Sequence, residues 1–195
     1  MIEIRTIEGG DHEQICKKVA QIHAKTLTVG LLPSLGQPFL ERLYRSAARD
    51  KSCILIVAVE DGRIIGFVMG SIAPPTLYLR SAFQTFPQIL TAMIKRPRVL
   101  SRLLSVLRYA ARSTSNPSAE LLSIAVCREH RGTGISGALL REFKLKMMIR
   151  NIRKFRVTAA ETQMAALKFY RKNGGIPVSE FNLGGLRSVT FIMSV

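Results

Sequence analysis

Residues 120–137 read ELLSIAVCREHRGTGISG, and three patterns follow one another in this stretch. The apolar run from Glu120 to Val126 predicts a β-strand, two closely spaced glycines predict a loop, and the residues after them begin a helix. The backbone N–H groups of such a loop converge at the positive end of the helix dipole, where they can bind an anion. Arg128 and Arg131 add positive charge beside it. The stretch therefore predicts a phosphate-binding loop, with a plain strand-to-helix turn as the alternative.

The elements before this stretch begin with a strand at residues 2–7, where polar and apolar residues alternate. Helical spacing of apolar residues predicts one helix over residues 12–27 and a second that runs through Phe39, Leu43 and Ala47. Two apolar segments, 53–59 and 63–69, flank Asp61-Gly62 and predict a β-hairpin with a tight turn.

The elements after it are a helix over residues 134–150, a strand at 155–160, a helix over 163–173 and two strands around Gly184-Gly185. The whole order predicts one α+β domain, residues 1–195, with a mixed sheet. A doubly wound nucleotide fold is excluded, because the loop lacks the full glycine pattern and its strand is not followed by a βαβ unit.

The segment 73–118 differs from the rest, because it carries seven basic residues and no acidic residue. Its pattern predicts two amphipathic helices inserted between the third and fourth strands, with arginines on one side and leucines on the other. An anionic acceptor, a nucleic acid or an acidic membrane surface could bind such a segment. The alternative is that the leucines pack on the core and the arginines are solvated.

The composition limits the remaining options. With 195 residues, 47% apolar, the chain suits a single compact domain, and its net charge of +16 implies affinity for something anionic. No window is long and apolar enough to span a membrane, and the start has no secretory pattern, so we expect a cytoplasmic protein. The three cysteines lack the paired spacing of a zinc site, so we expect no metal.

Two motifs carry a resemblance to a known family. Residues 131–136, RGTGIS, fit the pattern Gln/Arg-x-x-Gly-x-Gly/Ala with Ser136 in the last place, and residues 163–175, QMAALKFYRKNGG, fit Asn-x-x-Ala-x-x-Phe-Tyr-x-Lys-x-Gly-Phe with Gln163 and Gly175 as departures. The chain resembles the GCN5-related N-acetyltransferase (GNAT) superfamily over nearly all residues outside 73–118. The resemblance implies a mixed, mostly antiparallel central sheet flanked by helices, and acetyl-coenzyme A as cosubstrate.

The resemblance also implies which residues contact the cofactor. The fourth strand would bind the pantetheine arm through its main chain, as an added strand does. The loop would hold the diphosphate. The implied cofactor residues are Ile124, Ala125, Val126, Arg131, Gly132, Thr133, Gly134, Ile135, Ser136, Gln163 and Phe169, the last with a core position as its alternative.

Two residues are candidates for the proton transfers of acetylation. Glu120, at the start of the fourth strand, is a candidate base that takes a proton from the amine, directly or through water; the alternative is a strand-end glutamate in a salt bridge. Tyr170 lies where many superfamily members have the general acid that protonates the leaving thiolate; the alternative is a core tyrosine. No Cys-His-Asp arrangement flanks Cys127, which favours direct attack over a covalent intermediate.

The predicted function is thus N-acetyl transfer from acetyl-coenzyme A to a primary amine of a small molecule, such as an amino sugar. The alternatives are a peptide or protein amine as acceptor, a protein that binds acetyl-coenzyme A without catalysis, and a nucleic-acid-binding protein. We expect no nucleic-acid partner, because no reader motif is present and aromatic residues make up only 7% of the chain. The family and the apolar side of the insert suggest a homodimer.

Overall fold

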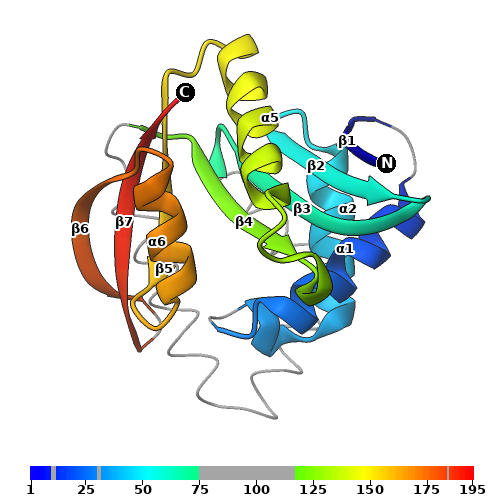
Figure 1. The fold of residues 1–195 in the computed structure, drawn as a ribbon, viewed down its shortest axis with the longest axis horizontal. Helices are drawn as coiled ribbons and strands as arrows, with labels where there is room; N and C mark the ends of the chain where they lie inside the picture. Colours follow the sequence, from blue (N-terminus) through cyan, green and yellow to red (C-terminus); the bar gives the residue numbers. More distant parts are fainter. Residues whose placement is uncertain (10–11, 30–31, 75–116, 184) are drawn as a thin grey trace.

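The computed structural model describes residues 1–9, 12–29, 32–74, 117–183 and 185–195 (Figure 1). Most of the segment predicted as a basic helical insert, residues 75–116, lies outside the described residues. The description therefore covers the sheet, the helices on both of its faces, and every residue singled out above as a site candidate.

One seven-stranded sheet forms the centre, in the order β1-β2-β3-β4-β5-β7-β6. Every neighbouring pair is antiparallel except β4 and β5, which are parallel. The strands are β1 (Ile2–Ile7), β2 (Cys53–Glu60), β3 (Arg63–Ser71), β4 (Glu120–Val126), β5 (Lys154–Ala160), β6 (Ile176–Leu183) and β7 (Leu186–Ser194). The predicted α+β class with a mixed, mostly antiparallel sheet is confirmed.

Helices cover both faces of this sheet (Figure 1). On one face lie α1 (Glu13–Thr26) and α2 (Gln37–Arg49), and on the other lie α5 (Ile135–Ile149) and α6 (Met164–Lys172). Short 3-10 turns, η1 (Leu32–Leu35) and η2 (Arg128–His130), precede α2 and α5. No helix in these described ranges has both the length and the apolar character needed to cross a membrane.

Each face has its own apolar core, and β2 contributes to both. Residues 53–59 of β2 are all buried, which explains why the sequence there is a continuous apolar run and not an alternating one. Close packing also requires a glycine at position 70 on β3, because a Cβ there would lie 2.4 Å from Cζ of Phe143 on α5. The α5 helix thus lies directly on the strand that precedes residues 75–116.

A buried polar pair lies in the core between the sheet and α1/α2. Nδ1 of His23 on α1 lies 2.6 Å from the hydroxyl of Tyr44 on α2, and the His23 ring stacks on Phe67 of β3. Only 2% of His23 is exposed. Burial disfavours the charged imidazolium and lowers the pKa of His23 to about 4.

We expect His23 to make the protein sensitive to acid. Because its pKa is lower in the folded chain than the ordinary value of 6.5, its contribution to stability is complete above that value and is lost as the pH falls toward 4. The free energy of unfolding should decrease by about 3 kcal/mol between pH 7 and pH 4 on account of this residue.

Urea unfolding at both pH values measures this decrease, with the variant His23→Gln as the test. This variant keeps a hydrogen-bonding side chain but cannot titrate, so its decrease should be smaller by about 3 kcal/mol. His12→Gln is the matched control, because it makes the same substitution at the start of α1, outside the buried core. An identical acid response of His23→Gln and the unaltered chain would contradict the prediction.

Candidate active site

The centre of the sheet contains an interruption between its two parallel strands. The register joins β4 to β5 only at Glu120 with Arg156 and at Leu121 with Val157. Beyond these pairs the strands diverge (Figure 1). On its other side β4 remains paired with β3 as far as Val126, with a register shift that adds one extra residue, Leu122, to β4. Residues 122–126 therefore have a main-chain edge without a β5 partner, which we call the open edge of β4.

One hydrogen bond shows which residues of β4 turn their main-chain N–H and C=O groups toward the open edge. The amide of Cys127 donates to the carbonyl of Ile65 on β3 at 2.8 Å. Successive residues of a strand direct their main-chain groups to opposite sides, so Ala125 also faces β3, whereas Ile124 and Val126 face away from it. The N–H and C=O groups of Ile124 and Val126 are thus the ones that an extended ligand could pair with.

The predicted phosphate loop, residues 131–136, lies at the end of this edge. Gly132 and Gly134 have φ angles of +82° and +87°, and a Cβ added to either would meet no heavy atom within 4 Å. Over the described ranges, no backbone hydrogen bond is donated by the amides of residues 132–137, whereas those of Arg131 and Ala138 are used. The loop therefore presents free N–H groups at the N-terminus of α5 with open space in front of its glycines.

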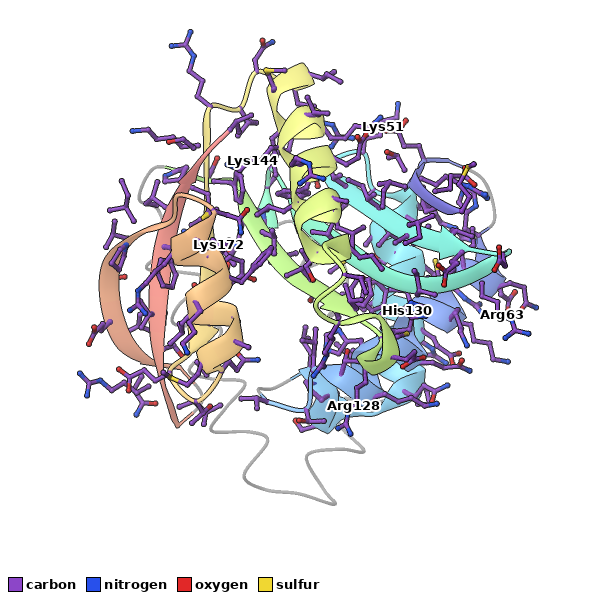
Figure 2. The ribbon with its side chains drawn as sticks, viewed as in Figure 1. Lys51, Arg63, Arg128, His130, Lys144 and Lys172 are labelled. Carbon is purple, nitrogen blue, oxygen red and sulfur yellow. The ribbon has the colours of Figure 1, made fainter. Side chains whose placement is uncertain are left out.

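The charge around the loop is mainly positive. Arg128 and Arg131 are exposed, and no acidic residue lies in the first turn of α5. Figure 2 shows Arg128 and His130 between the end of β4 and the start of α5. Nδ1 of His130 lies 3.5 Å from Oε2 of Glu60 at the end of β2. This contact ties η2 to the sheet, and the hydroxyl of Thr133 donates to the carbonyl of His130 at 2.7 Å.

Arg141 is a further basic residue at this end of α5, and it lies outside both sequence motifs. Its Nη1 lies 3.5 Å from the position that a Cβ on Gly137 would occupy, so the guanidinium reaches back over the first turn of α5. The signal was present in the sequence as the four-residue spacing between Gly137 and Arg141. A cation near the N-terminus of a helix is unfavourable unless an anion is close, so its placement is consistent with a phosphate ligand.

The second motif lies on α6 and the turn before it. Tyr170 is 5% exposed, and its ring packs against Phe169 and Phe191. Its hydroxyl makes no hydrogen bond within the described ranges. Burial raises the pKa of Tyr170, so the phenol keeps its proton. Oε1 of Gln163 accepts a hydrogen bond from the amide of Ala160 at 3.1 Å, which fixes the turn between β5 and α6.

Glu120 lies at the point where β4 and β5 meet. Its Oε2 accepts a hydrogen bond from Nε of Arg156 at 3.1 Å and lies 3.1 Å from Nη2 in the same ion pair, and both residues are 5% exposed. Its neighbours Ala119 and Leu121 belong to the core beneath α5 and α6, so Glu120 points to the opposite face, which α1 and α2 cover. Tyr170 packs on the α5/α6 face. The two candidate catalytic residues therefore lie on opposite faces of the sheet.

Comparisons with known proteins add the following. A family model for the acetyltransferase (GNAT) family matches residues 17–175. No curated protein sequence matches the chain. Three solved structures are similar in fold, and each comparison covers all of this chain. Ard1 from Thermoplasma volcanium has 18% identity and a TM-score of 0.63, with 97% of its chain covered. The ribosomal-protein-S18-alanine N-acetyltransferase from Escherichia coli has 10% identity, a TM-score of 0.63 and 94% covered, and the PaiA N-acetyltransferase from Thermoplasma acidophilum in complex with coenzyme A has 14%, 0.59 and 99%.

Proposed function

The chain belongs to the acetyltransferase (GNAT) family, and we propose that it transfers the acetyl group of acetyl-coenzyme A to a primary amine of a small molecule, such as an amino sugar, by direct attack. The observation that carries this proposal is the open edge of β4, which ends at a loop of free amides. An extended ligand arm can add to such an edge through main-chain hydrogen bonds. A diphosphate at the end of that arm would meet the amides.

Acetyl-coenzyme A is the cosubstrate of this enzyme family, and the residues of this chain fit it. Ile124 and Val126 would bind the pantetheine arm through their main chain, and the amides of residues 132–137 would bind the diphosphate, with Arg131 beside it. The glycines fit this role, because no side chain or neighbouring atom blocks the approach to Gly132 and Gly134.

The reaction forms a bond between the amine nitrogen and the acetyl carbon and breaks the bond from this carbon to sulfur. The attacking amine must lose its proton, and a lysine-like primary amine has a pKa of about 10, so a base is needed near neutral pH. Glu120 would accept this proton, directly or through water. Tyr170, which keeps its proton because it is buried, would donate it to the thiolate that leaves.

A panel of amines tests the proposal. Amino sugars, polyamines, aminoglycosides and peptides with a free N-terminus are each incubated with acetyl-coenzyme A, and mass spectrometry follows coenzyme A and the acetylated product. Acetylation of an amino sugar in preference to the peptides supports the small-molecule acceptor. Binding of acetyl-coenzyme A without turnover of any amine would instead indicate a protein that binds the cofactor without catalysis.

A peptide or protein amine is the second candidate acceptor, and the comparisons favour including it. One of the similar structures is an N-acetyltransferase for the alanine of a ribosomal protein, and another, with 14% identity, is the NatC complex bound to a Gag peptide and coenzyme A. Preferential acetylation of the peptides in the panel would replace the small-molecule proposal with this one.

The variant Arg131→Glu should weaken acetyl-coenzyme A binding by roughly 10- to 100-fold, because it replaces a cation beside the diphosphate with an anion. The loss should shrink as salt is added, since Arg131 is exposed and its charge is screened. Isothermal titration calorimetry at two salt concentrations measures both effects. Arg63→Glu is the matched control, since it makes the same change at an exposed arginine at the start of β3 (Figure 2). Equal losses in both variants would show a general charge effect and contradict the assignment of Arg131.

A further inference from the structure

The ion pair of Glu120 and Arg156 closes the interruption between β4 and β5 at one end. The two residues are register partners in the first of the two pairs that join these strands. The amide of Arg156 also donates to the carbonyl of Ala119 at 2.9 Å, so the main chain and the side chain of Arg156 hold the same end of β4. Beyond this point the open edge of β4 leads to the phosphate loop. A thioester whose diphosphate lies in that loop would extend toward Glu120.

The contacts within the pair involve only one of the two carboxylate oxygens of Glu120. Both guanidinium contacts end on Oε2, and no contact to Oε1 is present among the described residues. Arg156 also has an interaction besides this pair. The carboxylate is therefore held from one side, with Oε1 available on the other.

Arg156 is the one charge that acts on Glu120 among the described residues. Burial is the largest influence and holds the pKa of Glu120 above its ordinary value, while the charge and the hydrogen bond of Arg156 lower the pKa and so limit the rise. The neighbouring elements contribute uncharged groups to this face of the sheet: Ser71 of β3, Cys53 of β2, Ile192 of β7, and the hydrogen-bonded His23 and Tyr44 of α1 and α2. Without Arg156 this opposing influence is lost, so the pKa of Glu120 would rise further and a larger share of the carboxyl group would already hold the proton that a base must accept.

We propose that Arg156 is the positioning residue for Glu120: its guanidinium fixes the carboxylate through Oε2 and supplies the positive charge that keeps the buried group anionic, so that Oε1 can accept a proton from the acceptor amine, directly or through water. This inference rests on the proposed function, which makes Glu120 the base. It adds a residue that neither sequence motif contains. Arg156 touches no reacting atom and acts through Glu120.

Nuclear magnetic resonance of the full chain tests the charge state without any acceptor. Glutamate labelled with carbon-13 at its carboxyl group reports each titration, and Glu120→Gln identifies the signal of Glu120. In the unaltered chain Glu120 should be ionised at pH 7. In Arg156→Met its titration should move up by at least about one pH unit, and Arg156→Lys, which keeps the charge, should move it less.

Arg5→Met is the matched control, because Arg5 forms an exposed ion pair with Glu3 at 2.9 Å and should leave the titration of Glu120 unchanged. A protonated Glu120 at pH 7 in the unaltered chain would overturn the proposal whether or not Arg156→Met folds. An unchanged titration in a folded Arg156→Met chain would overturn it as well.

Kinetics with an amine from the panel separate the two proposals. The acidic limb of the kcat profile of Arg156→Met should move to higher pH together with the titration of Glu120, while KM for acetyl-coenzyme A stays unchanged. A loss of kcat that is the same at every pH would assign Arg156 a structural role only and overturn the inference. If no amine is acetylated by the unaltered chain, the proposed function fails, while the nuclear magnetic resonance titration still decides whether Arg156 keeps Glu120 ionised.

Discussion

The variant Gly134→Val should lose affinity for acetyl-coenzyme A by at least about 100-fold, the largest effect on binding that we expect from a single substitution. Gly134 occupies the N-cap position of α5 with a φ of +87°, a conformation that a β-branched residue adopts only with strain. Relief of this strain rotates the neighbouring peptide groups, and the valine side chain occupies the open space in front of the loop. Each lost hydrogen bond to a charged phosphate costs about 1.5–3 kcal/mol, so two of them account for the expected loss.

Gly185→Val is the matched control for this experiment. Gly185 has a φ of +83° in the turn between β6 and β7, and a Cβ there would also meet no heavy atom within 4 Å. The two variants therefore carry the same backbone strain, and only one of them changes the predicted phosphate loop. Calorimetric titration with acetyl-coenzyme A, alongside thermal unfolding, measures both. Unchanged affinity in a folded Gly134→Val chain would exclude the loop as the diphosphate site.

The variant Tyr170→Phe should lower kcat by roughly 100-fold while the affinity for acetyl-coenzyme A remains the same. The substitution removes a hydroxyl that makes no hydrogen bond within the described ranges, and it keeps the ring contacts with Phe169 and Phe191. A general acid donates its proton in the transition state only, so its loss lowers kcat without weakening binding. Steady-state kinetics with an amine from the panel, together with calorimetric titration, measures both quantities.

Tyr44→Phe removes the same atom from the other core and serves as the comparison. The hydroxyl of Tyr44 contacts His23 on the α1/α2 face, so we expect this variant to lose stability but to keep its kcat. Normal turnover by Tyr170→Phe would contradict the assignment of Tyr170 as the acid and leave it a core tyrosine. Equal losses of kcat in both variants would point to a general effect of weakened packing.

The order and type of the elements were predictable because each depends on local patterns. The hairpin of β2 and β3 follows from apolar runs around Asp61-Gly62, and its turn has positive φ at both of these residues. The glycine loop before α5 follows from two glycines placed between a strand and a helix, and both glycines take a positive φ. The residues that determine each of these features lie close together in the chain, so the features can be predicted from the sequence alone.

The sequence by itself determined the order and type of the strands and helices in the described residues, the α+β class, the glycine loop before α5 and the places of Glu120 and Tyr170 on these elements. The tertiary structure alone decided that β4 and β5 pair at only two positions, that β4 has an extra residue at Leu122, and that Glu120 meets Arg156 in a buried pair. The reason is that these contacts join residues far apart in the chain; Glu120 and Arg156, for example, are 36 positions apart. The periodicity of apolar residues predicts which face of a strand is buried, but it does not predict which polar groups of two different strands come into contact.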